Sequence, residues 1–146
     1  MKRHLIIAFA ITACAFASSP VAAQDEWETQ VRELLARAGS TLADRGFTSS
    51  HKVYTGSLGQ GAIEDVRVPL DADSQYVIQA VCDTDCSDLD LVLLNETGVE
   101  VDSDVLDDDH PSLTVNPTRS GNYLIRVAML ACAAEPCAFA VGIYSQ

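Results

Sequence analysis

The stretch NYLIRVAM, residues 122–129, decides the fold because its apolar side chains alternate with less apolar ones. Successive side chains on a β-strand point to opposite faces, so a period of two predicts a strand with one buried face. The same period recurs in QYVIQAV at 75–81, LDLVLL at 89–94 and FAVGI at 139–143. The predicted buried positions are Tyr76, Ile78, Ala80, Leu89, Leu91, Leu93, Tyr123, Ile125, Val127, Met129, Phe139, Val141 and Ile143.

Turn-forming residues separate these stretches. They occur at 56–61, 71–73, 95–98, 116–117 and 120–122. Seven or eight short strands with such spacing are typical of an antiparallel sandwich or barrel. We predict an all-β, antiparallel β-sandwich.

One amphipathic helix precedes the strands. Apolar side chains between residues 25 and 44 recur at steps of three and four, with charged residues between them, and Gly46 follows as a stop signal. The predicted apolar face holds Trp27, Val31, Leu34, Leu35, Ala38 and Leu42. Such a face must pack against its own domain or against a partner.

Residues 1–23 read as a secretory signal peptide. Lys2 and Arg3 precede an apolar run, and small residues end at Ala23. Alternatively, Cys14 is the lipidated cysteine of a lipoprotein, which would tether the chain to a membrane. Export to the periplasm or the exterior is expected, with a helix at 24–47 and a sandwich at 48–146.

The chain is strongly acidic. Its formal net charge is −12, which becomes −14 without Lys2 and Arg3. This charge repels nucleic acid and anionic lipid, so we expect no nucleic-acid partner, and it favours cations or basic partners. Between residues 83 and 109 there are eleven acids and neither Lys nor Arg.

The acidic stretch has two interpretations. Calcium takes six to eight oxygen ligands, and carboxylates are common donors. The candidate calcium ligands are Asp83, Asp85, Asp88, Asp90, Asp102 and Asp104, with Asp107, Asp108 and Asp109 in a wider pool. EF-hand spacing is absent, because Asp88 and Asp107 stand where the loop requires glycine. The other interpretation is a solvated acidic surface without a metal.

Four cysteines follow the predicted signal peptide, and they allow three pairings. We favour two local disulfides, Cys82 with Cys86 and Cys132 with Cys137, because each pair flanks a tight connection in an exported chain. A four-cysteine zinc site is the alternative. The first pair would then staple a turn that presents Asp83, Asp85 and Asp88.

A complete catalytic set is missing from the sequence. Beyond the signal peptide the only histidines are His51 and His110, which we expect to be exposed, and no G-x-S-x-G motif occurs. We therefore predict that the protein is not an enzyme. A small hydrolase that uses paired aspartates is kept as an alternative.

Residues 49–146 resemble the bacterial pre-peptidase C-terminal (PPC) domain, a jelly-roll-like β-sandwich that is appended to many secreted proteases. The resemblance rests on DLDL at 88–91, on Gly98, and on the strand that carries Gly121, Tyr123, Arg126 and Val127. It implies a jelly-roll-like sandwich. Relatives include collagen-binding domains, some of which bind calcium through acidic residues.

Together these observations predict a non-catalytic, exported binding module that recognises a protein or a cell-envelope partner. Apart from the candidate calcium ion, we expect no cofactor. The alternative is a structural or chaperone-like accessory that docks on another exported protein through its N-terminal helix.

Overall fold

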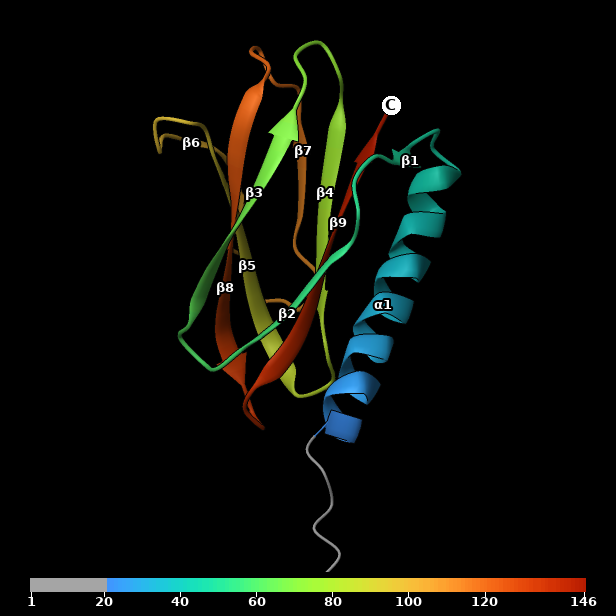
Figure 1. The fold of residues 1–146 in the computed structure, drawn as a ribbon, viewed down its shortest axis with the longest axis vertical. Helices are drawn as coiled ribbons and strands as arrows, with labels where there is room; N and C mark the ends of the chain where they lie inside the picture. Colours follow the sequence, from blue (N-terminus) through green and yellow to red (C-terminus); the bar gives the residue numbers. More distant parts are fainter. Residues whose placement is uncertain (1–20) are drawn as a thin grey trace, which may run out of the picture.

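The computed structural model describes residues 21–146 (Figure 1). One helix, α1 (Val21–Ala43), precedes nine strands in this part of the chain. The strands are β1 (Thr48–Ser49), β2 (Tyr54–Leu58), β3 (Ile63–Leu70), β4 (Tyr76–Cys82), β5 (Cys86–Leu94), β6 (Glu100–Asp104), β7 (Ser112–Val115), β8 (Gly121–Cys132) and β9 (Cys137–Ser145). They form two antiparallel sheets, which confirms the predicted β-sandwich with one N-terminal helix, but with nine strands within residues 21–146 in place of the predicted seven or eight.

Each sheet has a free edge on either side of the molecule. The first sheet has five strands in the order β1-β9-β4-β7, with β2 also paired to β9. The second has four strands in the order β3-β8-β5-β6. On one side of the sandwich β2 therefore lies opposite β3, and on the other side β7 lies opposite β6.

The core lies between the two sheets. All thirteen side chains that the period of two predicts as buried belong to this one cluster. Several of them, including Ile78, Leu89, Leu91 and Ile125, are fully inaccessible to solvent. Burial of a side chain of this size contributes about 1.5–3 kcal/mol to folding, so these alternating stretches contribute strongly to the stability.

Helix α1 covers the outer face of the five-stranded sheet (Figure 1). Val31 and Leu35 pack against Val81, Ala138 and Ala140. Leu42 and Phe47 pack against Val77 and Tyr144. The helix is thus part of the fold, and its apolar face is already occupied by its own sheet.

The position of the helix corrects one prediction. Strands β4 and β9 were predicted to be buried on one face, but nearly every residue of both is buried. The reason is that α1 covers the face that would otherwise meet water. Contact between helix and strand is close: a Cβ atom added at Gly39 would lie 2.7 Å from the Tyr144 hydroxyl oxygen.

Both local disulfides are confirmed. Cys82 bonds to Cys86 and Cys132 bonds to Cys137, with Cα atoms 5.9 Å apart in each pair. The zinc alternative is wrong, because it would need the same four sulfur atoms as thiolates. The disulfides close the β4–β5 and β8–β9 connections at one end of the sandwich.

Residues 1–20 lie outside the described part of the chain, and they include Cys14 and most of the predicted signal peptide. Helix α1 begins at Val21, earlier than the predicted start at residue 24. Within residues 21–146, no helix is both long enough and apolar enough to cross a membrane.

Candidate protein-binding surface

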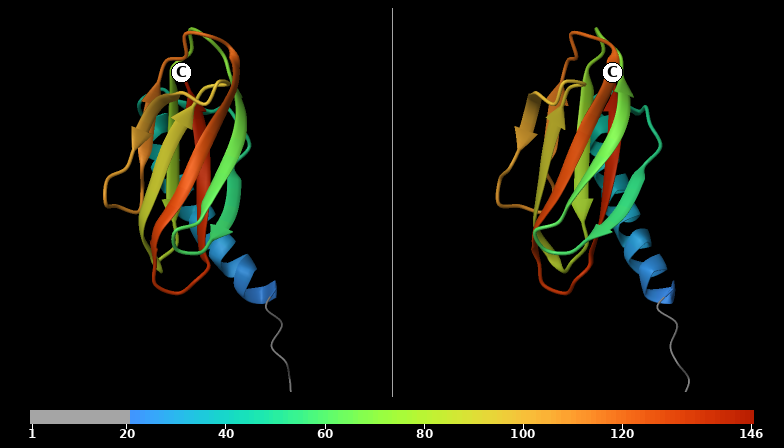
Figure 2. Two further views of the ribbon diagram at one scale, coloured as in Figure 1. Left: turned by 90° about the vertical axis from the view of Figure 1, so that its left-hand side faces the viewer. Right: turned by 60° about the vertical axis from the view of Figure 1, so that its left-hand side comes forward.

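Strand β6 and the loop that follows it form the edge of the sandwich farthest from α1 (Figure 2). Strand β6 pairs with β5, with Leu91 opposite Asp104 and Val92 opposite Ser103. Residues 105–111 then cross to β7 in the other sheet. We call residues 99–110 the β6 surface.

Hydrogen bonds give the crossing loop a defined shape. The Asp104 carboxylate accepts from the backbone N–H of Leu106 (3.4 Å) and from that of Ser112 (2.9 Å). The N–H of Leu89 on β5 donates to the carbonyl oxygen of Asp108 (2.9 Å). The loop is therefore held at both ends and against the neighbouring strand. Asp102 and Asp104 belong to β6 itself.

The β6 surface concentrates exposed apolar side chains. Six large apolar residues in the described part of the chain are exposed, and four of them are Val99, Val101, Val105 and Leu106. Leu106 is 66% exposed and Val105 is 59% exposed. Scattered single apolar residues are normal on a surface, but several on one edge are typical of an interaction site.

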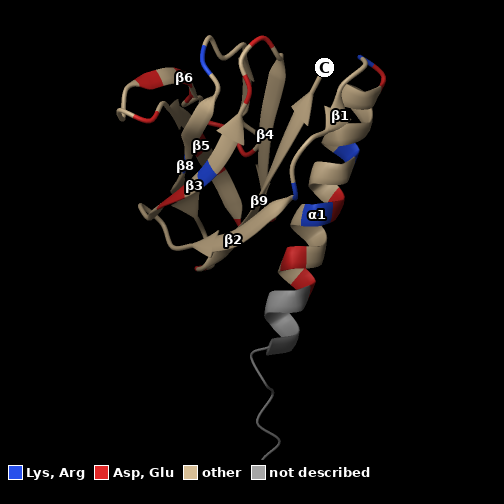
Figure 3. Cartoon of the chain, turned by 45° about the horizontal axis from the view of Figure 1, so that its top comes forward, with Lys and Arg blue, Asp and Glu red and all other residues tan. Residues whose placement is uncertain are grey.

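Acidic side chains crowd beside these apolar residues, and Figure 3 shows the acidic segments around β6. Partial burial raises the pKa of Asp88, and the carboxylates of Asp107 and Asp108 raise it further. Burial likewise raises the pKa of Asp90, followed by the charges of Asp88, Asp104 and Asp108. Like charges held this closely repel one another, and a cationic group placed among them would relieve the repulsion.

His110 contacts two of the neighbouring carboxylates. Its Nδ1 lies 2.8 Å from Asp109 Oδ1 and 3.6 Å from Asp108 Oδ1. The hydrogen bond with Asp109 is the main cause that raises the pKa of His110, and the nearby carboxylates add to it. His110 is exposed as predicted, but it is engaged with its neighbours rather than free.

The predicted calcium ligands have different environments. Asp83 is only 2% exposed, and its carboxylate accepts from the N–H groups of Asp85 (3.2 Å) and Ala138 (2.5 Å). The expectation that the stapled turn presents Asp83 outward is therefore wrong, because the carboxylate is turned inward to fasten the turn to β9.

The remaining candidates do not all converge. Asp102 caps the N–H of Ser103 (3.0 Å), and Asp104 holds the crossing loop. Within the part of the chain that the structure describes, no group of three or more His, Cys, Asp or Glu side chains is placed to hold one metal ion. Calcium binding at these residues stays a prediction.

His51 differs from its prediction, because it is half-buried. One ring nitrogen lies 2.9 Å from the Ser50 hydroxyl, and Nε2 lies 2.9 Å from the carbonyl oxygen of Pro69. Ser50 Oγ also lies 3.2 Å from the carbonyl oxygen of Ile143. These contacts join backbone segments of the two sheets, so His51 has a structural role in this fold.

The exposed apolar residues of the β6 surface were not foreseen from the sequence. Val99, Val101 and Val105 alternate with acids, a period of two that by itself would predict a buried face, yet the structure leaves all three exposed. The signal available was the high content of valine and leucine in a stretch too acidic to be buried. The acid content itself was recognised.

Comparison with solved structures finds proteins of similar fold. The crystal structure of Aeromonas hydrophila PliG, a periplasmic lysozyme inhibitor of g-type lysozyme, is similar, with a TM-score of 0.51. The match has 15% sequence identity and covers 70% of this chain and 90% of that chain. A de novo designed double-stranded β-helix, solved by NMR, matches with a TM-score of 0.39 and 16% identity, over 64% of this chain and 99% of that chain.

Comparison by sequence gives no family. No protein-family model matches the chain, and no curated protein sequence matches it. The resemblance to the PPC domain therefore stays a prediction, while the likeness to PliG shows a shared fold.

Proposed function

We propose that this protein is an exported, non-catalytic module that binds a basic protein through the β6 surface. The observation that carries the proposal is the coincidence of four exposed apolar side chains and a crowded set of carboxylates on one ordered edge. Apolar contacts supply the affinity of a protein interface, and complementary charge supplies orientation and association rate. A partner with lysine or arginine around an apolar patch fits both features.

Export is supported by the two disulfides, because disulfides persist in oxidising compartments such as the periplasm. The structural likeness to a periplasmic inhibitor protein agrees with a protein partner in that compartment. Since 15% identity supports the fold alone, g-type lysozyme is the first partner to test rather than an assigned one.

The first experiment is titration of the purified protein with a g-type lysozyme by calorimetry, together with an assay of lysozyme activity. The interface variant is Val105→Ser with Leu106→Ser. The matched control is Ile63→Ser with Leu130→Ser. These side chains are also exposed, but Ile63 lies on β3 and Leu130 lies near the C-terminal end of β8. Binding that is lost in the first variant and kept in the second supports the proposal. Equal binding by both variants contradicts the role of the β6 surface.

The accessory alternative, in which the N-terminal helix docks on another exported protein, has less support. Val31 and Leu35 are at most 1% exposed because they pack on β4 and β9. A helix can dock with its apolar face only if that face is free. Removal of α1 would expose the outer face of the five-stranded sheet, so we expect such a variant to unfold.

A further inference from the structure

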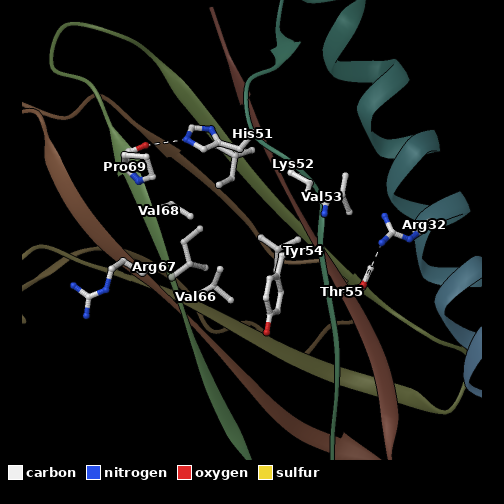
Figure 4. Close-up of a pocket in the computed structure, with 13 residues that line it drawn as sticks. Arg32, His51, Lys52, Val53, Tyr54, Thr55, Val66, Arg67, Val68 and Pro69 are labelled. Carbon is white, nitrogen blue, oxygen red and sulfur yellow. Dashed lines mark hydrogen bonds between the residues drawn. The ribbon is translucent and has the colours of Figure 1, made fainter.

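A recess lies on the side of the sandwich opposite the β6 surface, where β2 faces β3. It has a volume of about 420 Å³, within the roughly 300–1,000 Å³ that small-molecule pockets span. Thirteen residues line it (Figure 4). It shares none of them with the β6 surface, so it is a separate feature of the molecule.

Core side chains from both sheets form the wall of this recess. Val66 and Val68 come from β3, Ile125 from β8, and Val141 and Ile143 from β9. All five point into the space between the sheets and belong to the main core cluster. An apolar group that enters the recess would therefore meet the hydrophobic core directly.

Two hydrogen bonds between the edges frame the recess. The Tyr54 hydroxyl on β2 donates to the Glu64 carboxylate on β3, which raises the pKa of Tyr54. Further along, His51 Nε2 contacts the carbonyl oxygen of Pro69 at 2.9 Å. Figure 4 shows Tyr54 and His51 reaching toward β3, on which Val66 and Val68 lie. The framing makes the recess a preformed feature.

The charge around the recess is opposite to that of the whole chain. Acids outnumber Lys and Arg by 21 to 9 in the sequence, yet the lining residues include Arg32, Lys52 and Arg67 and neither Asp nor Glu. Arg32 is paired with Glu28 at 2.7 Å, and Figure 4 shows Arg67 directed away from the recess. The side chains of Lys52 and Arg67 form no hydrogen bond or ion pair within the described residues. Lys52 therefore remains as the unpaired cation at the opening, while the nearest carboxylates, those of Glu28 and Glu64, are engaged with Arg32 and Tyr54.

We infer that this recess binds an amphipathic anion, an apolar chain that ends in an anionic group. The chain would lie against Val66, Val68 and Val141, and the anionic end would remain at the opening near Lys52. An uncharged apolar wall favours the chain, and the unpaired ammonium group of Lys52 favours an anionic head over a cationic one. This inference is independent of the function proposed for the β6 surface.

The test uses decanoate as the probe and decyltrimethylammonium as the control, which has the same chain length and the opposite charge. Both are titrated into the purified protein below their micelle concentrations, with calorimetry for affinity and NMR for location. The expected result is binding of decanoate, with amide shifts confined to residues 51–55 and 66–69 and to the facing segments of β8 and β9. Binding of both probes with equal affinity, or of neither, would overturn the inference.

Variants locate the site. Lys52→Glu is expected to weaken decanoate binding roughly fivefold to tenfold by reversing the nearest unpaired charge. Arg119→Glu is the matched control, since Arg119 is exposed and lies outside the recess. Val68→Phe fills the recess and is expected to abolish binding, provided that its unfolding transition stays cooperative. Decanoate affinity that is unchanged in Lys52→Glu would also overturn the inference.

Discussion

The carboxylate of Asp83 accepts a hydrogen bond from the backbone N–H of Ala138, at 2.5 Å. The two residues are 55 positions apart in the sequence, and the contact fastens the turn closed by Cys82 and Cys86 to β9. Asp83 is the one buried charged or polar residue identified in the described part of the chain. Asp83, one of the acids in the stapled turn, therefore stabilises the fold. The crowded acids around β6 are instead the ones that we propose attract a basic partner.

Replacement of Asp83 tests that distinction. Asp83→Ala removes the acceptor for two backbone N–H groups and leaves the N–H of Ala138 without a partner. Loss of hydrogen bonds to a buried charged group costs about 1.5–3 kcal/mol each, so we expect the free energy of unfolding to fall by about 3 kcal/mol. Denaturant unfolding measures it. Asp85→Ala serves as the control, because its carboxylate has no such role, and a change within about 0.5 kcal/mol is expected there.

Asp90→Asn is expected to stabilise the protein while it weakens partner binding. Burial and neighbouring carboxylates raise the pKa of Asp90 in the folded state, so its ionised form opposes folding. The unfolding free energy of the wild type should fall as pH rises from the unfolded to the folded pKa of Asp90. The stabilisation by Asn is therefore fully present above that window and fades below it. Denaturant midpoints measured across acidic and neutral pH test the sign, and a destabilised variant at neutral pH would show that the repulsion is not felt.

The pKa of His110 should depend on Asp109. Their hydrogen bond raises the pKa of the imidazole, so charged His110 contributes stability that is present below its unfolded pKa and lost as pH rises through its folded pKa. We expect Asp109→Asn to lower the pKa of His110 toward its ordinary value. NMR titration of the imidazole protons measures this directly. An unchanged titration in that variant would mean that the Asp108 charge suffices.

Leu35→Ala tests whether the helix belongs to the core. Leu35 is 1% exposed and packs against the outer face of the five-stranded sheet. A buried leucine replaced by alanine costs about 2–5 kcal/mol, so the unfolding midpoint should fall by many degrees. Glu33→Ala, on the exposed face of α1, should change little. If both variants unfold at the wild-type midpoint, α1 is only loosely attached.

Local patterns predicted much of this fold. Alternation in NYLIRVAM and its three companion stretches identified the core-facing side of four strands, and the spacing of four cysteines identified both disulfides. These features depend on residues close together in the chain, so sequence reasoning reaches them.

Features that depend on distant residues were missed. The burial of Asp83 requires β9 beside the turn, and the burial of Val77 and Val81 requires α1 over the sheet. The recess lies between edges of two separate sheets, and contacts of Tyr54 and His51 with β3 bridge those edges. The exposure of Val105 and Leu106 likewise follows from where the loop crosses between sheets.

The measurement that tests the central claim most directly is capture from an extract of the cell envelope with three baits: wild type, Val105→Ser with Leu106→Ser, and Ile63→Ser with Leu130→Ser. Captured proteins are identified and quantified at low and at high salt. We predict that the wild type and the Ile63 and Leu130 variant retain the same basic protein, and that the Val105 and Leu106 variant loses it. The retained amount should fall at high salt, because part of the attraction is between charges. Capture of the same proteins by all three baits would contradict the assignment of the β6 surface as the binding site.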